Sequence, residues 1–316
     1  MLISAKTLQG FNGIAKIPGD KSISHRSVII PSITNGITEV KNILKSEDVL
    51  RTINAFKLMG VKIEENNNCL LIHGKGLRSL SKPKNKINLG NSGTSARLLT
   101  GLLSAQNFES FLFGDLSLSK RPMNRIINPL KQMGASIESN NEKLPVIIRG
   151  KKLNGIKYEL DIPSAQVKSG ISLAALFIEN PTEIIENHIT RNHTEIMLKS
   201  FNANIEIKKI NKINHILIKG NKELTPKNIS VPSDLSSAAF FIVAALINDN
   251  SKIEMKNINI NPTRNGFLTA INKMNGQVII KNKKEINGEI ISDIQVNYSK
   301  LKGCELDKEI TKLMID

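Results

Sequence analysis

The stretch Pro18-Gly19-Asp20-Lys21-Ser22-Ile23-Ser24-His25-Arg26 leads directly into the apolar run 28–33. The run predicts a helix, and hydroxyl side chains at a helix start accept hydrogen bonds from unpaired backbone N–H groups. The same end of a helix carries a partial positive charge, to which Lys21 and Arg26 add two formal ones. The stretch is therefore either a binding site for a phosphate or carboxylate, or a serine-rich helix cap with solvated charges.

The same combination occurs three more times, which favours the anion-binding interpretation. Each copy places small hydroxyl residues before a helix rich in Ala and Leu. The copies are Leu89-Gly90-Asn91-Ser92-Gly93-Thr94-Ser95-Ala96-Arg97 before 98–103, Ser164-Ala165-Gln166-Val167-Lys168-Ser169-Gly170 before 171–177, and Pro232-Ser233-Asp234-Leu235-Ser236-Ser237 before 238–247. The spacing is not that of a P-loop, because no Gly-Lys-Ser/Thr follows.

A second pattern alternates with the first. Helix ends with a basic residue and a Gly or Asn stop are followed by alternating strand residues. They are Lys57-Leu58-Met59-Gly60, Lys131-Gln132-Met133-Gly134, Lys199-Ser200-Phe201-Asn202 and Lys273-Met274-Asn275-Gly276. The period is about 70 residues. Each copy predicts helix, strand, helix, strand, polar turn and strand, with turns at Asn66-Asn67-Asn68, Asn140-Asn141-Glu142 and Asn211-Lys212. The fold class is therefore α/β.

An ordered set of motifs along the whole chain resembles the 5-enolpyruvylshikimate-3-phosphate synthases, also called 3-phosphoshikimate 1-carboxyvinyltransferases. The matching segments are 18–26, 89–97, Lys120-Arg121-Pro122-Met123, 164–169, Arg191-Asn192-His193-Thr194-Glu195, Asn261-Pro262-Thr263-Arg264 and Leu313-Met314-Ile315-Asp316. Segments 164–169 and 191–195 resemble the bacterial subgroup that includes glyphosate-tolerant members.

The resemblance implies an enolpyruvyl transferase-like inside-out barrel of repeated βαβαββ units, with helices inside and sheets outside. The family has two similar domains of three units each. Residues 21–231 are expected to form one complete three-unit domain, and 1–20 with 232–316 part of the other, namely one unit plus an N-terminal strand. Six units need about 420 residues, whereas this chain has 316. We therefore expect the sequence to be C-terminally incomplete and the partial domain to expose core surface.

The activity implied is transfer of the enolpyruvyl group of phosphoenolpyruvate to the 5-hydroxyl of shikimate 3-phosphate. The products are 5-enolpyruvylshikimate 3-phosphate and phosphate, and the step belongs to chorismate and aromatic amino acid biosynthesis in the shikimate pathway. The reaction needs a proton donor, a proton acceptor and cationic clamps. We expect no cofactor and no metal.

Two residues match catalytic positions of the family. Lys21 matches the lysine that contacts both substrates, and Asp316 matches the aspartate that accepts the 5-hydroxyl proton. Substrate-binding matches are Lys21, Ser22 and Arg26 for shikimate 3-phosphate, Gly93, Thr94 and Arg121 for phosphoenolpyruvate, Ser164, Ala165 and Gln166 for the 3-phosphate and ring hydroxyls, and Arg191 as a weaker candidate for the phosphate. The family's later Lys-Glu-Ser-Asp-Arg and His-Arg motifs have no counterpart in this sequence, so we expect little turnover.

Three neighbouring polar residues are better explained by structure than by chemistry. His25 is expected to pack or form a hydrogen bond beside Arg26 rather than act as a base. Asp20 is expected to fix the turn and pair with Lys21 or Arg26. Asp234 is expected to cap the helix that follows it.

Composition excludes several classes of protein. The net charge of +16 would suit a nucleic-acid partner, but aromatic residues are only 4% and the lysines are scattered among abundant Asn and Ile, which indicates codon bias. No apolar run is long enough for a membrane span. Cys69 and Cys304 lack metal-ligand spacing and suit a reducing compartment. We expect a cytoplasmic monomer with small-molecule substrates.

Two alternatives remain open. The related transferase that acts on UDP-N-acetylglucosamine shares the fold, but its usual reactive cysteine is absent from Gly114-Asp115-Leu116-Ser117-Leu118-Ser119-Lys120. The chain could also be a non-catalytic phosphate-binding remnant, because the motifs for the second half of the site have no counterpart.

Overall fold

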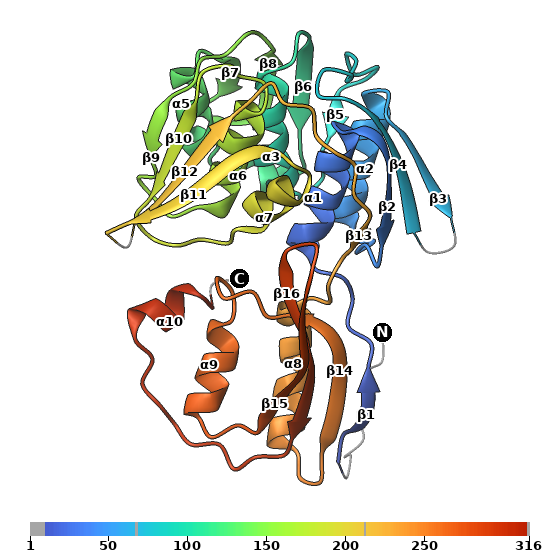
Figure 1. Ribbon diagram of the computed structural model, residues 1–316, viewed down its shortest axis with the longest axis vertical. Coiled ribbons are helices and arrows are strands. Elements are labelled where there is room, and N and C mark those ends of the chain that lie inside the picture. Colours follow the sequence, from blue (N-terminus) through green and yellow to red (C-terminus); the bar gives the residue numbers. More distant parts are fainter. Residues whose placement is uncertain (1–9, 67–68, 212, 315–316) are drawn as a thin grey trace. The chain divides into compact units, whose positions relative to one another are not determined.

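The computed structural model describes residues 10–66, 69–211 and 213–314 (Figure 1). These residues form two compact units. The large unit is Lys21–Val231, and the small unit combines the chain up to Asp20 with the chain from Pro232 onward. None of the helices in the described ranges has the length and apolar character that a membrane span requires.

In the part of the chain that the structure describes, four sheets of four strands share one topology. In each sheet a first strand pairs in parallel with a second, and the second pairs antiparallel with a third. The third forms a hairpin with the fourth. In that order the sheets are β13 (Ile229–Ser230), β2 (Asn35–Lys41), β4 (Cys69–Lys75) and β3 (Lys62–Asn66); β5 (Ile87–Asn88), β6 (Glu109–Phe113), β8 (Lys143–Arg149) and β7 (Ser136–Asn140); β9 (Lys157–Glu159), β10 (Thr182–Glu186), β12 (Ile213–Lys219) and β11 (Asn204–Ile210); and β1 (Asn12–Ala15), β14 (Lys252–Asn259), β16 (Glu289–Asn297) and β15 (Val278–Ile286).

The α/β class and the predicted repeat are therefore confirmed. The local sequence pattern did not reveal the short parallel edge strands β5, β9 and β13, whereas β1 is a strand within residues 1–20, where the family resemblance implied one. Strand β13 closes the large unit, because it pairs with β2 from the start of the unit. That long-range pairing has no local signal in the sequence.

Three helices form the interior of the large unit, as Figure 1 shows. They are α1 (Lys21–Ser32), α3 (Gly93–Ser104) and α6 (Ala165–Ala175), and almost every residue in them is buried. Helices α3 and α6 approach so closely that a Cβ at Gly101 would lie 2.0 Å from the carbonyl oxygen of Gly170. Helices α2 (Glu47–Leu58), α4 (Leu116–Ser119), α5 (Asn124–Gln132) and α7 (His193–Ser200) complete the unit.

The predicted helix starts were too late. The polar motifs are the first turns of the helices rather than loops before them, since α1 begins at Lys21 and α3 at Gly93. The side chain of Ser164 accepts a hydrogen bond from Val167 N at the start of α6. A capping hydroxyl satisfies the first N–H groups, so the helix can begin at the polar residues themselves.

The predicted stops and turns are present. Gly60, Gly134, Asn202 and Asn275 all have positive φ values, which Gly and Asn adopt most easily. Asn141 and Glu142 form the turn between β7 and β8 with φ values of 50° and 54°. Residues Asn67, Asn68 and Lys212 of the other predicted turns lie outside the described residues. Asn287 and Gly288 form the matching turn in the fourth repeat, which the sequence analysis did not identify.

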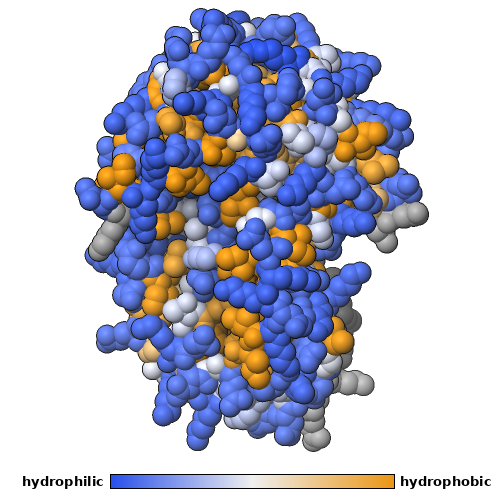
Figure 2. Space-filling view, viewed as in Figure 1, coloured by the Kyte–Doolittle hydropathy of each residue, from blue (hydrophilic) through white to orange (hydrophobic). Residues whose placement is uncertain are grey.

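The described residues of the small unit form one sheet with α8 (Leu235–Ile247), α9 (Gly266–Lys273) and α10 (Lys308–Lys312). One side of α8 packs on the sheet through buried residues such as Ile242. On its other side, Phe240 is 80% exposed and Ile247 is 61% exposed. Figure 2 shows apolar surface on this unit, in the lower half of the view.

Two acidic residues of the small unit take part in its polar contacts. Asp234 caps α8 as predicted and accepts a hydrogen bond from Ser236 N at 3.1 Å. The Asp20 side chain has an ionic partner within the small unit. Its carboxylate bonds Arg264, which also donates to Asp234. This partner lies 244 residues away in sequence, and no local pattern predicts it.

Candidate active site

Residues at the starts of several helices line a cavity of about 370 Å³ in the large unit. Its lining contains four cations and one carboxylate, with neutral polar groups between them. The lining residues are Lys21, Asp48, Asn91, Gly93, Thr94, Arg97, Arg121, Arg125, Ser164 and Gln166. Because helix N-termini add partial positive charge to the formal charges, the cavity is suited to a multiply charged anion.

Lys21 is the first residue of α1 and lies at the cavity wall. Its Nζ is 2.7 Å from Oδ2 of Asp48 in the first turn of α2. The Lys21 side chain is 50% exposed, so the ammonium group remains accessible to a ligand. A partly exposed pair of this kind stabilises the fold little, and its main effect is to orient the lysine.

Arg121 is held by a short chain of polar groups. Its Nη2 donates to Oδ1 of Asn91, and Nδ2 of Asn91 donates to Oδ2 of Asp115 at 2.9 Å. The pKa of Asp115 is lowered, first by the hydrogen bond from Leu118 N and then by Asn91 and the nearby Arg121. The ionised carboxylate thus fixes the amide that orients the guanidinium.

Arg97 shows that positive charge is concentrated here. It donates to the carbonyl oxygens of Gly93 at 3.0 Å and Pro122 at 3.1 Å. Its pKa is lowered, first by burial and then by the charges of Arg121 and Arg125. Three guanidinium groups that repel one another gain stability when an anion binds between them.

The starts of α3 and α6 are joined across the cavity. Nε2 of Gln166 donates to Oγ1 of Thr94 at 3.2 Å. Gly93 leaves room for the arginines, because a Cβ there would lie 2.9 Å from Nη1 of Arg97. Two predicted binding segments therefore form one site.

Six of the predicted site residues line this cavity, and the other predicted residues do not belong to its described lining. Lys21, Gly93, Thr94, Arg121, Ser164 and Gln166 line the cavity. Ser22, Ala165 and Arg191 are not among its lining residues, and Asp316 lies outside the described residues.

Arg26 also stands apart from the cavity lining, at only 3% exposure. It donates from Nε to Oγ1 of Thr194 at 2.6 Å, from Nη1 to the carbonyl oxygen of Ser22 at 2.8 Å and from Nη2 to Oγ of Ser169 at 2.7 Å. The guanidinium therefore joins α1, α6 and α7. His25 forms the expected hydrogen bond, at 2.8 Å from Nδ1 to Oγ1 of Thr52.

Sequence reasoning missed four residues of the lining. Arg97 was part of a quoted motif but had no assigned role, and Asn91 was not assigned to the site. Arg125 lies four residues after Arg121, a spacing that could have drawn attention to it. Asp48 had no sequence signal, because only the packing of α2 beside α1 brings it to Lys21.

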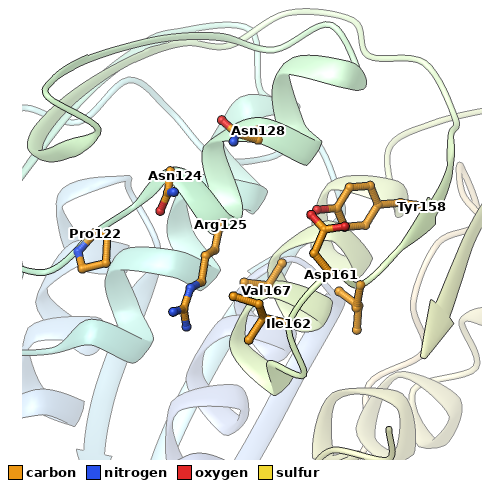
Figure 3. A pocket seen from close by; sticks show the side chains of 9 residues that line it. Pro122, Asn124, Arg125, Asn128, Tyr158, Asp161, Ile162 and Val167 are labelled. Atoms are coloured by element: carbon orange, nitrogen blue, oxygen red, sulfur yellow. The ribbon is translucent and has the colours of Figure 1, made fainter. Parts of the chain in front are cut away.

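A second cavity of about 290 Å³ lies beside the first and shares Arg125 with it (Figure 3). Figure 3 shows Tyr158 and Asp161 lying close together on its wall, opposite the α5 side chains. Burial, followed by the Asp161 charge, raises the pKa of Tyr158. Its other lining residues are Pro122, Asn124, Asn128, Leu160, Ile162 and Val167. With one cation and an apolar wall, it suits an anion less well than the first cavity.

Comparison with known proteins supports the motif-based expectation. The profile of the family "EPSP synthase (3-phosphoshikimate 1-carboxyvinyltransferase)" matches residues 6–315. The 3-phosphoshikimate 1-carboxyvinyltransferase of Ruthia magnifica subsp. Calyptogena magnifica is 49% identical over 312 residues, which are 98% of this chain and 71% of that protein. The one of Geobacter metallireducens is 44% identical, with 99% and 72% covered.

A solved structure agrees with these sequence relatives. EPSP synthase from Acinetobacter baumannii superposes with a TM-score of 0.88 at 44% identity, covering 96% of this chain and 68% of that one. The alternative family that acts on UDP-N-acetylglucosamine is not favoured. The chain belongs to the EPSP synthase (3-phosphoshikimate 1-carboxyvinyltransferase) family.

Proposed function

We propose that this chain binds shikimate 3-phosphate and phosphoenolpyruvate and catalyses enolpyruvyl transfer between them. The observation that carries the proposal is the convergence of Lys21, Arg97, Arg121 and Arg125 on one cavity at the starts of α1, α3 and α6. Both substrates are multiply charged anions, and a cavity with this charge is complementary to them.

The chemistry of the cavity side chains assigns them to one substrate or the other. Arg121, oriented through Asn91, offers the planar fork that binds a carboxylate or phosphate of phosphoenolpyruvate. The hydroxyl of Ser164 and the free N–H groups at the start of α6 suit the 3-phosphate. Thr94, joined to Gln166, lies between these two groups.

The chemistry requires protonation of the methylene carbon of phosphoenolpyruvate and loss of the proton from the attacking 5-hydroxyl. Lys21 is the proposed proton donor, because it is the accessible ammonium group of the cavity. Asp316 is the proposed acceptor, a role that rests on the family resemblance alone. The cations that surround the cavity would stabilise charge on the departing phosphate.

The proposed setting is the cytoplasm, where the free thiols of Cys69 and Cys304 would remain reduced. We propose a monomer, because all the described residues that line the cavity come from one large unit.

Calorimetric titration tests binding separately from turnover. We expect shikimate 3-phosphate and phosphoenolpyruvate to bind and UDP-N-acetylglucosamine not to bind. Binding of the UDP-sugar without shikimate 3-phosphate would overturn the substrate assignment. A phosphate-release assay with both substrates then measures turnover. No release of phosphate above a no-enzyme control would leave a binding protein and overturn the catalytic part.

A further inference from the structure

One lysine and two glutamate side chains meet in the interior of the large unit. Nζ of Lys168 on α6 lies 2.8 Å from Oε1 of Glu186 at the end of β10 and 2.6 Å from Oε1 of Glu195 on α7. The exposed fractions of the three side chains are 0%, 2% and 1%. This ionic cluster, Lys168 with Glu186 and Glu195, joins three elements of the third repeat.

The cluster is poorly explained as a device for stability. Removing charges from water is costly, and apolar residues of similar volume often replace a buried ion pair without loss. Burial alone would lower the pKa of Lys168, but the charges of Glu195 and Glu186 outweigh it and the pKa is raised. Oε2 of Glu195 is buried without a hydrogen-bond partner among the described residues. Because burying these charges costs free energy, the cluster is better explained if it fixes the arrangement of α6, α7 and β10.

Both ends of the ionic cluster adjoin the residues that hold Arg26. Lys168 precedes Ser169, and Glu195 follows Thr194. The hydroxyls of Ser169 and Thr194 lie 2.6 Å apart, and both accept hydrogen bonds from Arg26. Ser169 also donates to the carbonyl oxygen of Ala165 at 2.6 Å, in the first turn of α6. A shift between α6 and α7 would therefore move both the guanidinium and the start of α6.

We propose that Lys168 is a positioning residue for shikimate 3-phosphate. Together with Glu186 and Glu195 it holds α6 against α7, so that Arg26 and the first turn of α6 keep the arrangement that receives the substrate phosphate. The inference rests on the proposed function and adds a residue with no contact to the substrate. Binding of phosphoenolpyruvate depends on Arg121 and α3 instead. Substitution of Lys168 should therefore affect the affinities for the two substrates differently.

The test is titration of each substrate into Lys168→Met, which removes the charge at nearly constant side-chain length. We expect the Kd for shikimate 3-phosphate to rise by about 10- to 100-fold, the effect of a misplacement of about 1 Å. The Kd for phosphoenolpyruvate should change less than about twofold, a shift small beside a tenfold step.

Two further variants separate positioning from folding. Lys168→Met with Glu186→Gln and Glu195→Gln leaves no uncompensated buried charge, and it should fold yet still bind shikimate 3-phosphate weakly. Ile72→Ala opens a cavity in the sheet of the first repeat, where Ile72 is fully buried. It should lower the melting temperature without changing the ratio of the two Kd values.

Wild-type affinity for shikimate 3-phosphate in the folded triple variant would overturn the inference. An equal rise in the Kd values of both substrates in Lys168→Met would also overturn it. If the unmodified chain failed to bind shikimate 3-phosphate, the proposed function would fall first and this inference with it.

Discussion

Nε2 of Gln166 donates a hydrogen bond to Oγ1 of Thr94 at 3.2 Å and so ties the first turn of α6 to the first turn of α3. The two residues lie 72 positions apart in sequence. The contact depends on the close packing of the two helices, which Gly101 and Gly170 permit. Two helix ends of successive repeats thereby line one cavity.

Arg121→Ala should weaken phosphoenolpyruvate binding by about 2–5 kcal/mol, because a substrate anion would lose its paired cation. Titration of both substrates measures the effect. Shikimate 3-phosphate should bind nearly as before. Arg149→Ala is the matched control, since this exposed arginine pairs with Glu109 and Glu138 away from the cavity lining. Equal losses for both substrates would contradict the division of roles.

Arg26→Ala should weaken the binding of shikimate 3-phosphate and also lower the free energy of unfolding of the chain. The substitution leaves the buried hydroxyls of Ser169 and Thr194 without their charged donor. Such a loss costs about 1–3 kcal/mol for a buried group. Urea unfolding and titration on the same sample separate the two effects. Arg121 is exposed, so Arg121→Ala should leave the urea midpoint unchanged. A similar fall in the urea midpoint of both variants would contradict the stabilising role of Arg26.

Asp115→Asn should reduce stability only where the native carboxylate is ionised. The folded pKa of Asp115 is lowered by Leu118 N, Asn91 and Arg121. Its contribution is therefore present above the unfolded pKa of about 3.9 and is lost as the pH falls through the lower folded value.

Thermal unfolding from pH 7 to pH 2 checks this prediction. The difference in melting temperature between the unmodified chain and Asp115→Asn should be constant near neutrality and shrink in the acid range. Glu179→Gln, at an exposed position, is the control for the loss of a surface carboxylate. A difference that grew as the pH fell would have the wrong sign.

Hydrogen exchange should be faster in the small unit than in the large unit. Helix α8 exposes Phe240, Val243 and Ile247, whereas almost every residue of α3 is buried. Local stability follows buried contacts, so amides of α8 should open more often. Mass spectrometry of exchanged peptides compares 235–247 with 93–104. Equally slow exchange in both peptides would mean that the exposed face of α8 does not weaken the helix.

The sequence by itself determined the features that depend on neighbouring residues. Gly60 and Asn202 mark helix stops because a positive φ is a local steric requirement, and Asp234 marks a helix start because its carboxylate reaches an adjacent N–H. Repetition of these signals revealed the α/β repeat. The motifs also named six of the residues that line the cavity.

Tertiary structure alone decided the features that join distant parts of the chain. No local pattern pairs Asp20 with Arg264, adds β13 beside β2, or places Asp48 next to Lys21. The same holds for the ionic cluster, whose Lys168 looked like one more polar residue at a helix start. The physical reason is that a local conformation is selected by the chain's own next few residues, whereas a buried charge or an edge strand is selected by whichever partner the packed fold supplies.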